Sequence, residues 1–183
     1  MSNFTENEIK NSFIRLLEKK PLKSITIRDI VDDCGINRSS FYYHFQDIPA
    51  LLEKIIQENS EAIIRKNANG TLPECMRGVI GFLLMHKKSV IHIYKAVDRE
   101  TFEQWSLQSC SYFVSFYLDH LPDIESVSEK TRARIEQFYL YLIFGFLQKW
   151  INRGLPEKET AEFLLMLERS CDFEELKEKF KDE

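Results

Sequence analysis

The feature that most constrains this chain is a four-residue connection, residues 34–37, between two short runs with helical spacing. Thr26 can cap the first run, and Asp29 occupies the capping-box position behind it. Gly35 can adopt the positive φ that redirects the chain, and Asn37 can cap the second run. Two short helices joined by a tight turn that contains glycine form a helix-turn-helix, so we expect this motif near the N-terminus.

Longer helices are predicted on both sides of the motif. Thr5 and Glu8 have capping-box spacing at the start of a first helix, which Pro21 ends. Asp47 can cap a fourth helix with Pro49 in its first turn. Further helices are expected over residues 73–86, 89–95, 99–120, 128–153 and 156–169, with a linker over 67–73 and a weak helix over 172–183. Six glycines and five prolines among 183 residues are few, which favours an all-helical protein over a sheet with many turns.

The composition excludes several classes of protein. An apolar content of 44% is enough for a core, and a net charge of −4 argues against a protein that coats nucleic acid nonspecifically. The four cysteines lie far apart, which indicates neither a disulfide scaffold nor a zinc site. The N-terminus lacks a signal-peptide run, and the most apolar stretch, residues 138–151, is too short to span a bilayer. We therefore expect a soluble, cytoplasmic protein without a membrane partner.

Sequence signatures of enzymes are missing. The chain has no glycine-rich phosphate loop, no Gly-x-Ser-x-Gly elbow and no His/Glu spacing that puts two metal ligands on one helical face. His86 and His92 are six residues apart, the wrong interval for sharing a face. We therefore predict no enzymatic activity, no cofactor and no metal site.

The second helix of the motif carries many polar and aromatic groups for its length. On a helix over residues 38–44, Ser39, Ser40 and Tyr43 can share an outward face while Phe41 turns into the core. Arginine, serine and tyrosine side chains can bind phosphate oxygens and base edges, and a major groove admits a helix. The pattern therefore predicts that this helix faces double-stranded DNA.

The segment from Ser24 to Ile55, SITIRDIVDDCGINRSSFYYHFQDIPALLEKI, resembles the DNA-binding domain of the TetR family of transcriptional regulators. The resemblance implies an all-α protein with a three-helix DNA-binding head over residues 1–50. A long helix would join this head to a larger helical domain over residues 51–183, which dimerises and binds a small effector. The implied function is a homodimeric regulator, expected to be a repressor whose operator binding the effector controls. Residues 138–167 also resemble a subgroup that includes regulators of dihydroxyacetone kinase operons.

The resemblance further implies roles for individual residues of the head. Thr26 would donate to a phosphate at a helix N-terminus, and Tyr42 and His44 would hold the DNA backbone. The residues expected to bind DNA are Thr26, Arg28, Asn37, Arg38, Ser39, Ser40, Tyr42, Tyr43 and His44, with Arg38, Ser39, Ser40 and Tyr43 reading bases. For Tyr42 and His44, packing within the head is the alternative.

One position departs from the family pattern. Members commonly carry a phosphate-binding lysine near the start of the fourth helix, where this chain has Ile48 followed by Pro49. Losing that cation should weaken DNA binding and lower its salt dependence by about one unit of slope. An alternative function is therefore a coregulator of the same fold that binds a protein partner and has weak or no DNA binding of its own. An effector-binding protein without a DNA role is a third, less favoured reading.

Two further sites are predicted in the larger domain. Aromatic residues can line a cavity for a small apolar or neutral effector, with core packing as the alternative for each residue. The predicted effector residues are His86, His92, Tyr94, Trp105, Cys110, Phe113, Phe116, Tyr117 and Tyr141. The helix over 128–153 is apolar on two sides, which predicts that a partner subunit covers one of them, unless the helix is central within its own domain. The predicted dimer residues are Phe138, Tyr139, Leu142, Phe146, Trp150, Phe163, Leu164 and Leu167.

Overall fold

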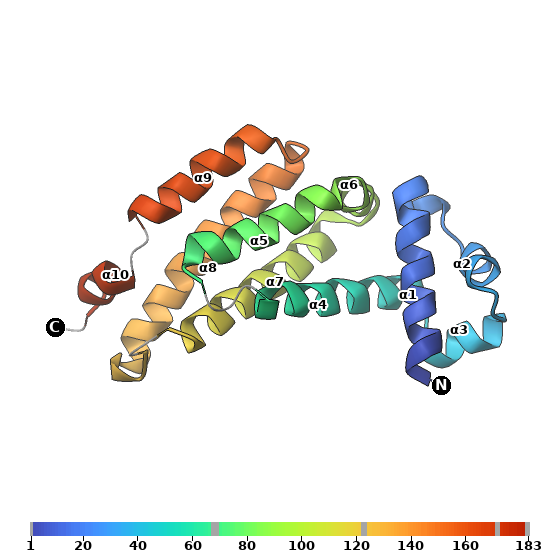
Figure 1. The fold of residues 1–183 in the computed structure, drawn as a ribbon, viewed down its shortest axis with the longest axis horizontal. Helices are drawn as coiled ribbons and strands as arrows, with labels where there is room; N and C mark the ends of the chain where they lie inside the picture. The colour runs from blue at the N-terminus through green and yellow to red at the C-terminus, as the bar shows by residue number, and fades with distance from the viewer. Residues whose placement is uncertain (1, 67–69, 122–123, 171–172, 182–183) are drawn as a thin grey trace. The chain divides into compact units, whose positions relative to one another are not determined.

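The computed structural model describes residues 2–66, 70–121, 124–170 and 173–181, which contain helices and no strand. The first helices are α1 (Ser2–Lys19), the 3-10 turn η1 (Leu22–Ser24), α2 (Ile27–Cys34), α3 (Arg38–His44) and α4 (Ile48–Lys66). They are followed by α5 (Leu72–Met85), α6 (Lys87–Ala96), α7 (Arg99–Asp119), η2 (Ile124–Ser126), α8 (Glu129–Asn152), α9 (Glu157–Ser170) and α10 (Phe173–Lys179) (Figure 1). The predicted all-α fold is confirmed. Among the described helices, none combines the length and apolar character needed to cross a bilayer.

Most predicted helix ends are confirmed, and one is wrong. Thr26 and Asn37 cap α2 and α3, and Gly35 ends α2. The predicted cap at Thr5 is wrong because α1 begins at Ser2, and no glycine or proline ahead of Thr5 stops the helix from extending. In the predicted linker, residues 67–69 lie outside the described residues. The last two linker residues, Leu72 and Pro73, belong to α5, because a proline is tolerated in the first turn of a helix.

The chain divides into two compact units. The first combines Met1–Asn59 with His86–Phe102, and the second combines Ser60–Met85 with Glu103–Glu183. The helix α6 belongs to the first unit because it packs on α1 and η1. The division into a DNA-binding head over 1–50 and an effector domain over 51–183 describes function and stays a prediction.

The core of the first unit forms where α1 packs on α2 and α3 (Figure 1). Ile9 and Phe13 of α1, Ile30 of α2 and Phe41 of α3 are fully buried. The buried hydroxyl of Ser12 donates to the carbonyl of Ile30 at 3.1 Å. This bond pairs a polar group that would otherwise be buried without a partner, and it fixes α2 against α1.

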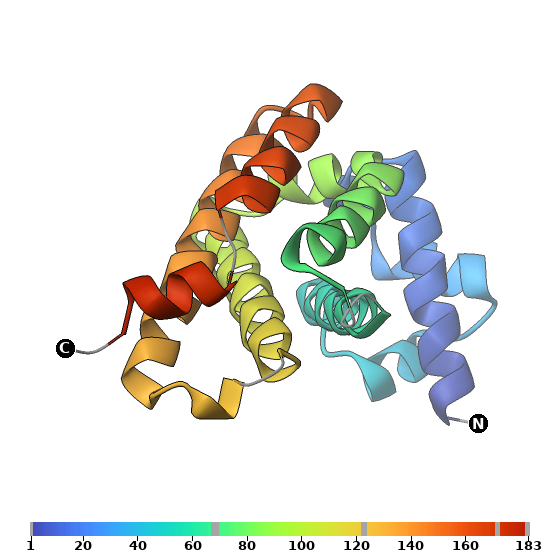
Figure 2. The same ribbon diagram turned by 60° about the vertical axis from the view of Figure 1, so that its left-hand side comes forward.

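The second unit is built around α8. Ile135, Tyr139 and Trp150 are fully buried, and α9 returns alongside α8 (Figure 2). The indole Nε1 of Trp150 donates to the carbonyl of Pro156 at 3.0 Å across the turn between the two helices. The helix α10 packs on α8, and just after α10 ends, the ring of Phe180 lies 6.0 Å from that of Phe138. One side of α8 is therefore buried within its own chain.

Candidate nucleic-acid interface

The N-terminus of α2 is organised by a capping box. The backbone amide and the hydroxyl of Thr26 donate to Asp29 Oδ2 at 2.7 and 2.6 Å, and Thr26 Oγ1 accepts from the Asp29 amide at 3.2 Å. The side-chain bond from Thr26, together with the Lys20 ammonium 3.0 Å away, lowers the pKa of Asp29 to about 2. The hydroxyl proton of Thr26 is therefore directed at a carboxylate, and a phosphate at this position would have to compete for it.

Local hydrogen bonds position α3 after the turn. Gly35 has a φ of 70°, a left-handed conformation that favours glycine. Two residues later, Asn37 Oδ1 accepts from the amide and the hydroxyl of Ser40 at 2.8 and 3.1 Å. Asn37 and Ser40 thus hold the start of α3 in place through its cap.

The helix α3 separates a buried aromatic side from an exposed polar one. Phe41 is fully buried, whereas Tyr42 and Tyr43 leave 57% and 78% of their surfaces exposed. The ring of Tyr42 still packs edge-on against Phe41, with 5.7 Å between centroids. His44 is half-buried, with its ring edge-on to Tyr43 at 5.0 Å. Arg38 and Ser39 are also exposed, so α3 presents a cation, a hydroxyl and two phenols.

The acidic residues of α2 are each paired with a basic side chain. The pairs are Asp29 with Lys20 at 3.0 Å, Asp32 with Arg28 at 3.5 Å and Asp33 with Arg15 at 2.7 Å. The hydrogen bond from Arg15 is the main cause that lowers the pKa of Asp33. These pairs offset the repulsion that three carboxylates would exert on a DNA backbone. The pair with Asp32 also means that the positive charge of Arg28, one of the predicted DNA-binding residues, is partly neutralised within the head.

The helix α4 begins without a cation. Asp47 caps it by accepting from the amide of Ala50 at 2.8 Å, which confirms the predicted cap. Ile48 is half-buried, and the next basic residue along α4 is Lys54, 3.6 Å from Glu58. The position of the usual phosphate-binding lysine is therefore apolar.

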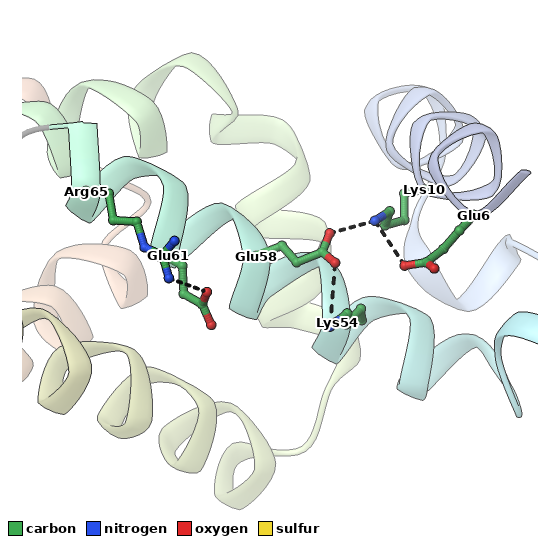
Figure 3. Close-up of polar contacts among 6 residues, drawn as sticks. All are labelled: Glu6, Lys10, Lys54, Glu58, Glu61 and Arg65. Carbon is green, nitrogen blue, oxygen red and sulfur yellow. Dashed lines mark hydrogen bonds and ion pairs between the residues drawn. The ribbon is translucent and has the colours of Figure 1, made fainter. Parts of the chain in front are cut away.

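Sequence reasoning missed the contact that fastens α1 to α4. Lys10 Nζ donates to Glu58 at 2.7 Å and to Glu6 at 3.2 Å (Figure 3). Burial opposes the charge of Lys10, but the hydrogen bonds to the two carboxylates outweigh it and raise the pKa of Lys10. The spacing of Glu6 and Lys10 is a signal for a helical ion pair, whereas nothing in the sequence links Lys10 to Glu58.

The predicted effector residues divide between the two units. His86, His92 and Tyr94 lie in the first, where His92 Nδ1 is 2.8 Å from the carbonyl of Leu17 and His86 Nδ1 is 3.4 Å from Glu18. In the second unit Cys110, Phe113 and Tyr117 are buried, Trp105 and Phe116 are half-buried, and Tyr141 is 65% exposed. Burial raises the pKa of the Cys110 thiol to about 12, as in a core cysteine. Within the described ranges, no three side chains of metal-ligating type form a cluster.

The predicted dimer residues pack mainly inside the second unit. Tyr139, Trp150, Phe163 and Leu167 are buried, and Phe138, Leu142, Phe146 and Leu164 are half-buried. The rings of Phe146 and Phe163 stack with centroids 3.7 Å apart and planes inclined by 2°. These contacts join α8 to α9 within one chain, and the role of the eight residues in a dimer interface stays a prediction.

Known proteins share both parts of this architecture. Residues 14–55 match the family described as bacterial regulatory proteins, tetR family, and residues 70–169 match a transcriptional regulator C-terminal region. Over 52 residues the chain is 44% identical to the uncharacterized HTH-type transcriptional regulator YerO of Bacillus subtilis (strain 168). That match covers 28% of this chain and only 18% of the length of YerO.

Two solved structures share the fold over most of the chain. The dihydroxyacetone kinase operon activator DhaS has a TM-score of 0.70 at 19% identity, covering 89% of this chain and 93% of its own. A TetR-family transcriptional regulator from Rhodococcus sp. has a TM-score of 0.53 at 14% identity, covering 88% and 95%. At these identities the likeness concerns the fold alone.

Proposed function

Because the chain belongs to the TetR family of transcriptional regulators, we propose that it is a homodimeric repressor whose operator binding is controlled by a small effector. The observation that carries this proposal is the exposed side of α3. Arg38, Tyr42 and Tyr43 are exposed on a head whose core side chains, such as Phe41, are buried, so they are available to a partner. A helix that presents such groups fits a major groove.

The exposed groups of the head take different roles in this proposal. Arg38, Ser39 and Tyr43 read bases, while Tyr42 and His44 hold phosphates. Arg28 and Thr26 lie at the N-terminus of α2, where backbone amides favour an anion. Asn37 and Ser40 act through the cap, by keeping α3 in the orientation that the groove requires.

In this proposal the effector acts by changing the separation of the two heads in the dimer. A dimer reads two half-sites only when its two α3 helices are separated by about one turn of DNA. An effector that favours another separation shifts the population away from the DNA-binding form. A repressor of this kind occupies promoter DNA when the effector is absent. The structural relative DhaS is named an activator, so the sign of regulation needs its own measurement.

A gel-shift titration tests DNA binding. The purified chain is mixed with DNA from around its own gene, with unrelated DNA as competitor and at two salt concentrations. We expect specific, salt-sensitive retardation with two chains per site. Arg38→Ala should abolish it, whereas Lys95→Ala removes an exposed cation on α6 and should not. A folded dimer that selects no sequence from a random DNA library would overturn the proposal.

A reporter assay tests the sign of regulation. The operator is placed upstream of a reporter gene, and transcription is measured with and without the chain. Repression predicts lower transcription when the chain is present. Higher transcription would overturn the repressor assignment and leave DNA binding intact.

The apolar start of α4 favours a second candidate, a coregulator that binds a protein partner. Ile48 offers no cation to a phosphate, which weakens the head as a DNA-binding module. Under this alternative, Arg38→Ala and Tyr42→Phe leave partner binding unchanged, and the wild-type chain retards no DNA at low salt.

A further inference from the structure

Lysines gather where α6 packs against the end of α1. Residues 19–23 and 86–89 contain five lysines and neither Asp nor Glu. Four of these lysines, which we call the lysine edge, are exposed: Lys19, Lys23, Lys87 and Lys88. The whole chain has a net charge of −4, so this concentration of cations at one place points to an anionic partner.

Hydrogen bonds hold the first turn of α6 beside the last turn of α1. Ser89 Oγ donates to Glu18 Oε1 at 3.2 Å, and His86 Nδ1 lies 3.4 Å from the same oxygen. One turn further along α6, His92 Nδ1 lies 2.8 Å from the carbonyl oxygen of Leu17. The helix α6 also packs on η1, and it lies beside the end of α1 in both views of the ribbon (Figures 1 and 2). Lysines from two distant parts of the sequence therefore share one edge of the first unit.

The lysine edge adjoins the N-terminus of α2. Lys20, the fifth lysine, lies 3.0 Å from Asp29 Oδ2, and the same oxygen accepts from the hydroxyl of Thr26. Two backbone hydrogen bonds of 2.9 and 3.0 Å fix the turn η1, which holds Lys23 three residues before Thr26. The proposed function places DNA phosphates at the N-terminus of α2. The lysine edge is therefore the surface that the DNA backbone meets next on the η1 side.

Most of the positive charge at this edge is not neutralised within the chain. Lys19, Lys23 and Lys88 form no ion pair with another described residue. The carboxylates of Glu18 and Asp29 offset two of the five lysine charges. A lysine ammonium binds phosphate as a point charge and imposes no fixed direction, which suits a DNA backbone. The same charges would also attract an acidic protein, but the position beside the N-terminus of α2 favours DNA.

We propose that the lysine edge binds the phosphates of DNA that flanks the half-site read by α3. The inference rests on the DNA binding of the proposed function. It assigns a DNA contact to α6, a helix that lies outside the head predicted over residues 1–50. It also supplies cations to a head in which α4 begins at Ile48 without one.

Fluorescence anisotropy with two duplexes of different length tests the contact. One duplex ends at the outer edges of the two half-sites, and the other extends about 10 base pairs beyond each edge. The wild-type chain should bind the longer duplex at least about 10-fold more tightly at low salt. Its slope of log affinity against log salt should be steeper by about 0.9 for each added phosphate contact. A change of the flanking base sequence should have no effect, because phosphate contacts do not read bases.

The double variant Lys23→Ala with Lys88→Ala should lose this advantage. It removes two contacts from each chain, so between about 50 and 200 mM salt its affinity for the longer duplex should fall at least about 10-fold less than that of wild type. Its affinity for the shorter duplex should not change. Lys95→Ala is the matched control, because it removes an exposed lysine of α6 that lies two turns beyond Lys88. It should behave as wild type, and circular dichroism should show both variants folded.

Three outcomes would overturn the inference. A wild-type chain that binds both duplexes equally would do so and leave the proposed function standing. A double variant that keeps the wild-type slope on the longer duplex would do the same, and loss of its binding to polyglutamate would then assign the lysine edge to an acidic protein. A folded wild-type chain that selects no operator would overturn the proposed function together with the inference.

Discussion

The side chain of Tyr42 can both pack within the head and bind a phosphate. Its ring packs edge-on against the buried Phe41, yet 57% of its surface stays exposed. Tyr42→Phe keeps the ring and removes only the hydroxyl, so it separates packing from phosphate binding. We expect operator affinity to fall about 10-fold, the usual value of one hydrogen bond to a charged oxygen. The urea midpoint of unfolding should not change.

Fluorescence anisotropy with labelled operator measures the affinity, and Arg38→Ala serves as the reference for a lost base contact. If Tyr42→Phe lowered the unfolding midpoint and left the affinity unchanged, Tyr42 would be a packing residue, which is the alternative that its sequence left open.

The capping box of α2 predicts that the stability of the fold depends on pH in the acid range. The pKa of Asp29 falls from 3.8 to about 2 through its bonds to Thr26 and Lys20. A carboxyl whose pKa is lower in the folded state stabilises the fold above its unfolded pKa, and this contribution is lost as pH falls through the folded pKa. We therefore expect Asp29→Asn to destabilise the chain at pH 7 and the difference from wild type to shrink between about pH 4 and pH 2.

Urea midpoints at several pH values measure this difference. The control is Asp32→Asn, since Asp32 lies on the same helix in an exposed pair with Arg28 at 3.5 Å and should change stability little. A constant difference for Asp29→Asn at all pH values would show that the Asp29 carboxylate does not titrate as its bonds require.

The sequence predicts helix caps well because each cap is a hydrogen bond between residues that are close in the sequence. Thr26 with Asp29, and Asn37 with Ser40, are three residues apart, and short polar side chains at such spacing have few other ways to pair. The predicted cap at Thr5 is wrong for a reason of the same kind: the spacing permits a cap, but the preceding residues also permit helix, and α1 begins at Ser2. Local spacing limits the choices without always deciding between them.

Single side chains also join whole elements, and Lys10 is the clearest case. It ties α1 to α4 through Glu58, with only 12% of its own side chain exposed, while Lys54 reaches the same carboxylate from a more exposed position (Figure 3). Removing Lys10 leaves Glu6 and Glu58 without their shared cation. We expect Lys10→Met to lower the free energy of unfolding by about 2 kcal/mol.

Lys54→Met is the matched control, and it should lower the same free energy by no more than about 0.5 kcal/mol, as is usual for an exposed ion pair on a helix. Both values come from urea unfolding monitored by circular dichroism. Equal losses in the two variants would mean that the link between α1 and α4 does not depend on Lys10.

The start of α4 gives a prediction about DNA. Ile48→Lys introduces a cation where the family commonly places one, so it should add one phosphate contact. The slope of log affinity against log salt should then steepen by about 0.9, with tighter binding at low salt. Leu107→Lys adds the same charge at an exposed apolar position of α7 in the second unit and should leave the slope unchanged. An unchanged slope for Ile48→Lys would place the start of α4 away from the backbone.

At the scale of the molecule, the sequence predicts helices better than it predicts their neighbours. The all-α architecture followed from periodicity, but the packing of α6 on α1 did not, because it depends on contacts such as His92 with the carbonyl of Leu17. Of the two apolar sides of α8, one was predicted to be covered by its own domain and the other by a partner, and the structure buries Ile135, Tyr139 and Trp150 while leaving Phe138, Leu142 and Phe146 half-buried. Core and interface share the same apolar periodicity, so the sequence alone does not tell which apolar side of a helix meets a partner.

If the regulator is a dimer, its DNA affinity should depend on the spacing between the two half-sites of the operator. Two heads held by one dimer read half-sites on the same side of the duplex, about 10 base pairs apart from centre to centre. Inserting about 5 base pairs between the half-sites turns the second one to the opposite side, so affinity should fall at least about 100-fold towards that of a single half-site. Anisotropy titrations against the two operators measure this. If the insertion left the affinity of the wild-type chain unchanged, the two heads would bind DNA independently. An effector could then not control DNA binding by changing the separation of the heads.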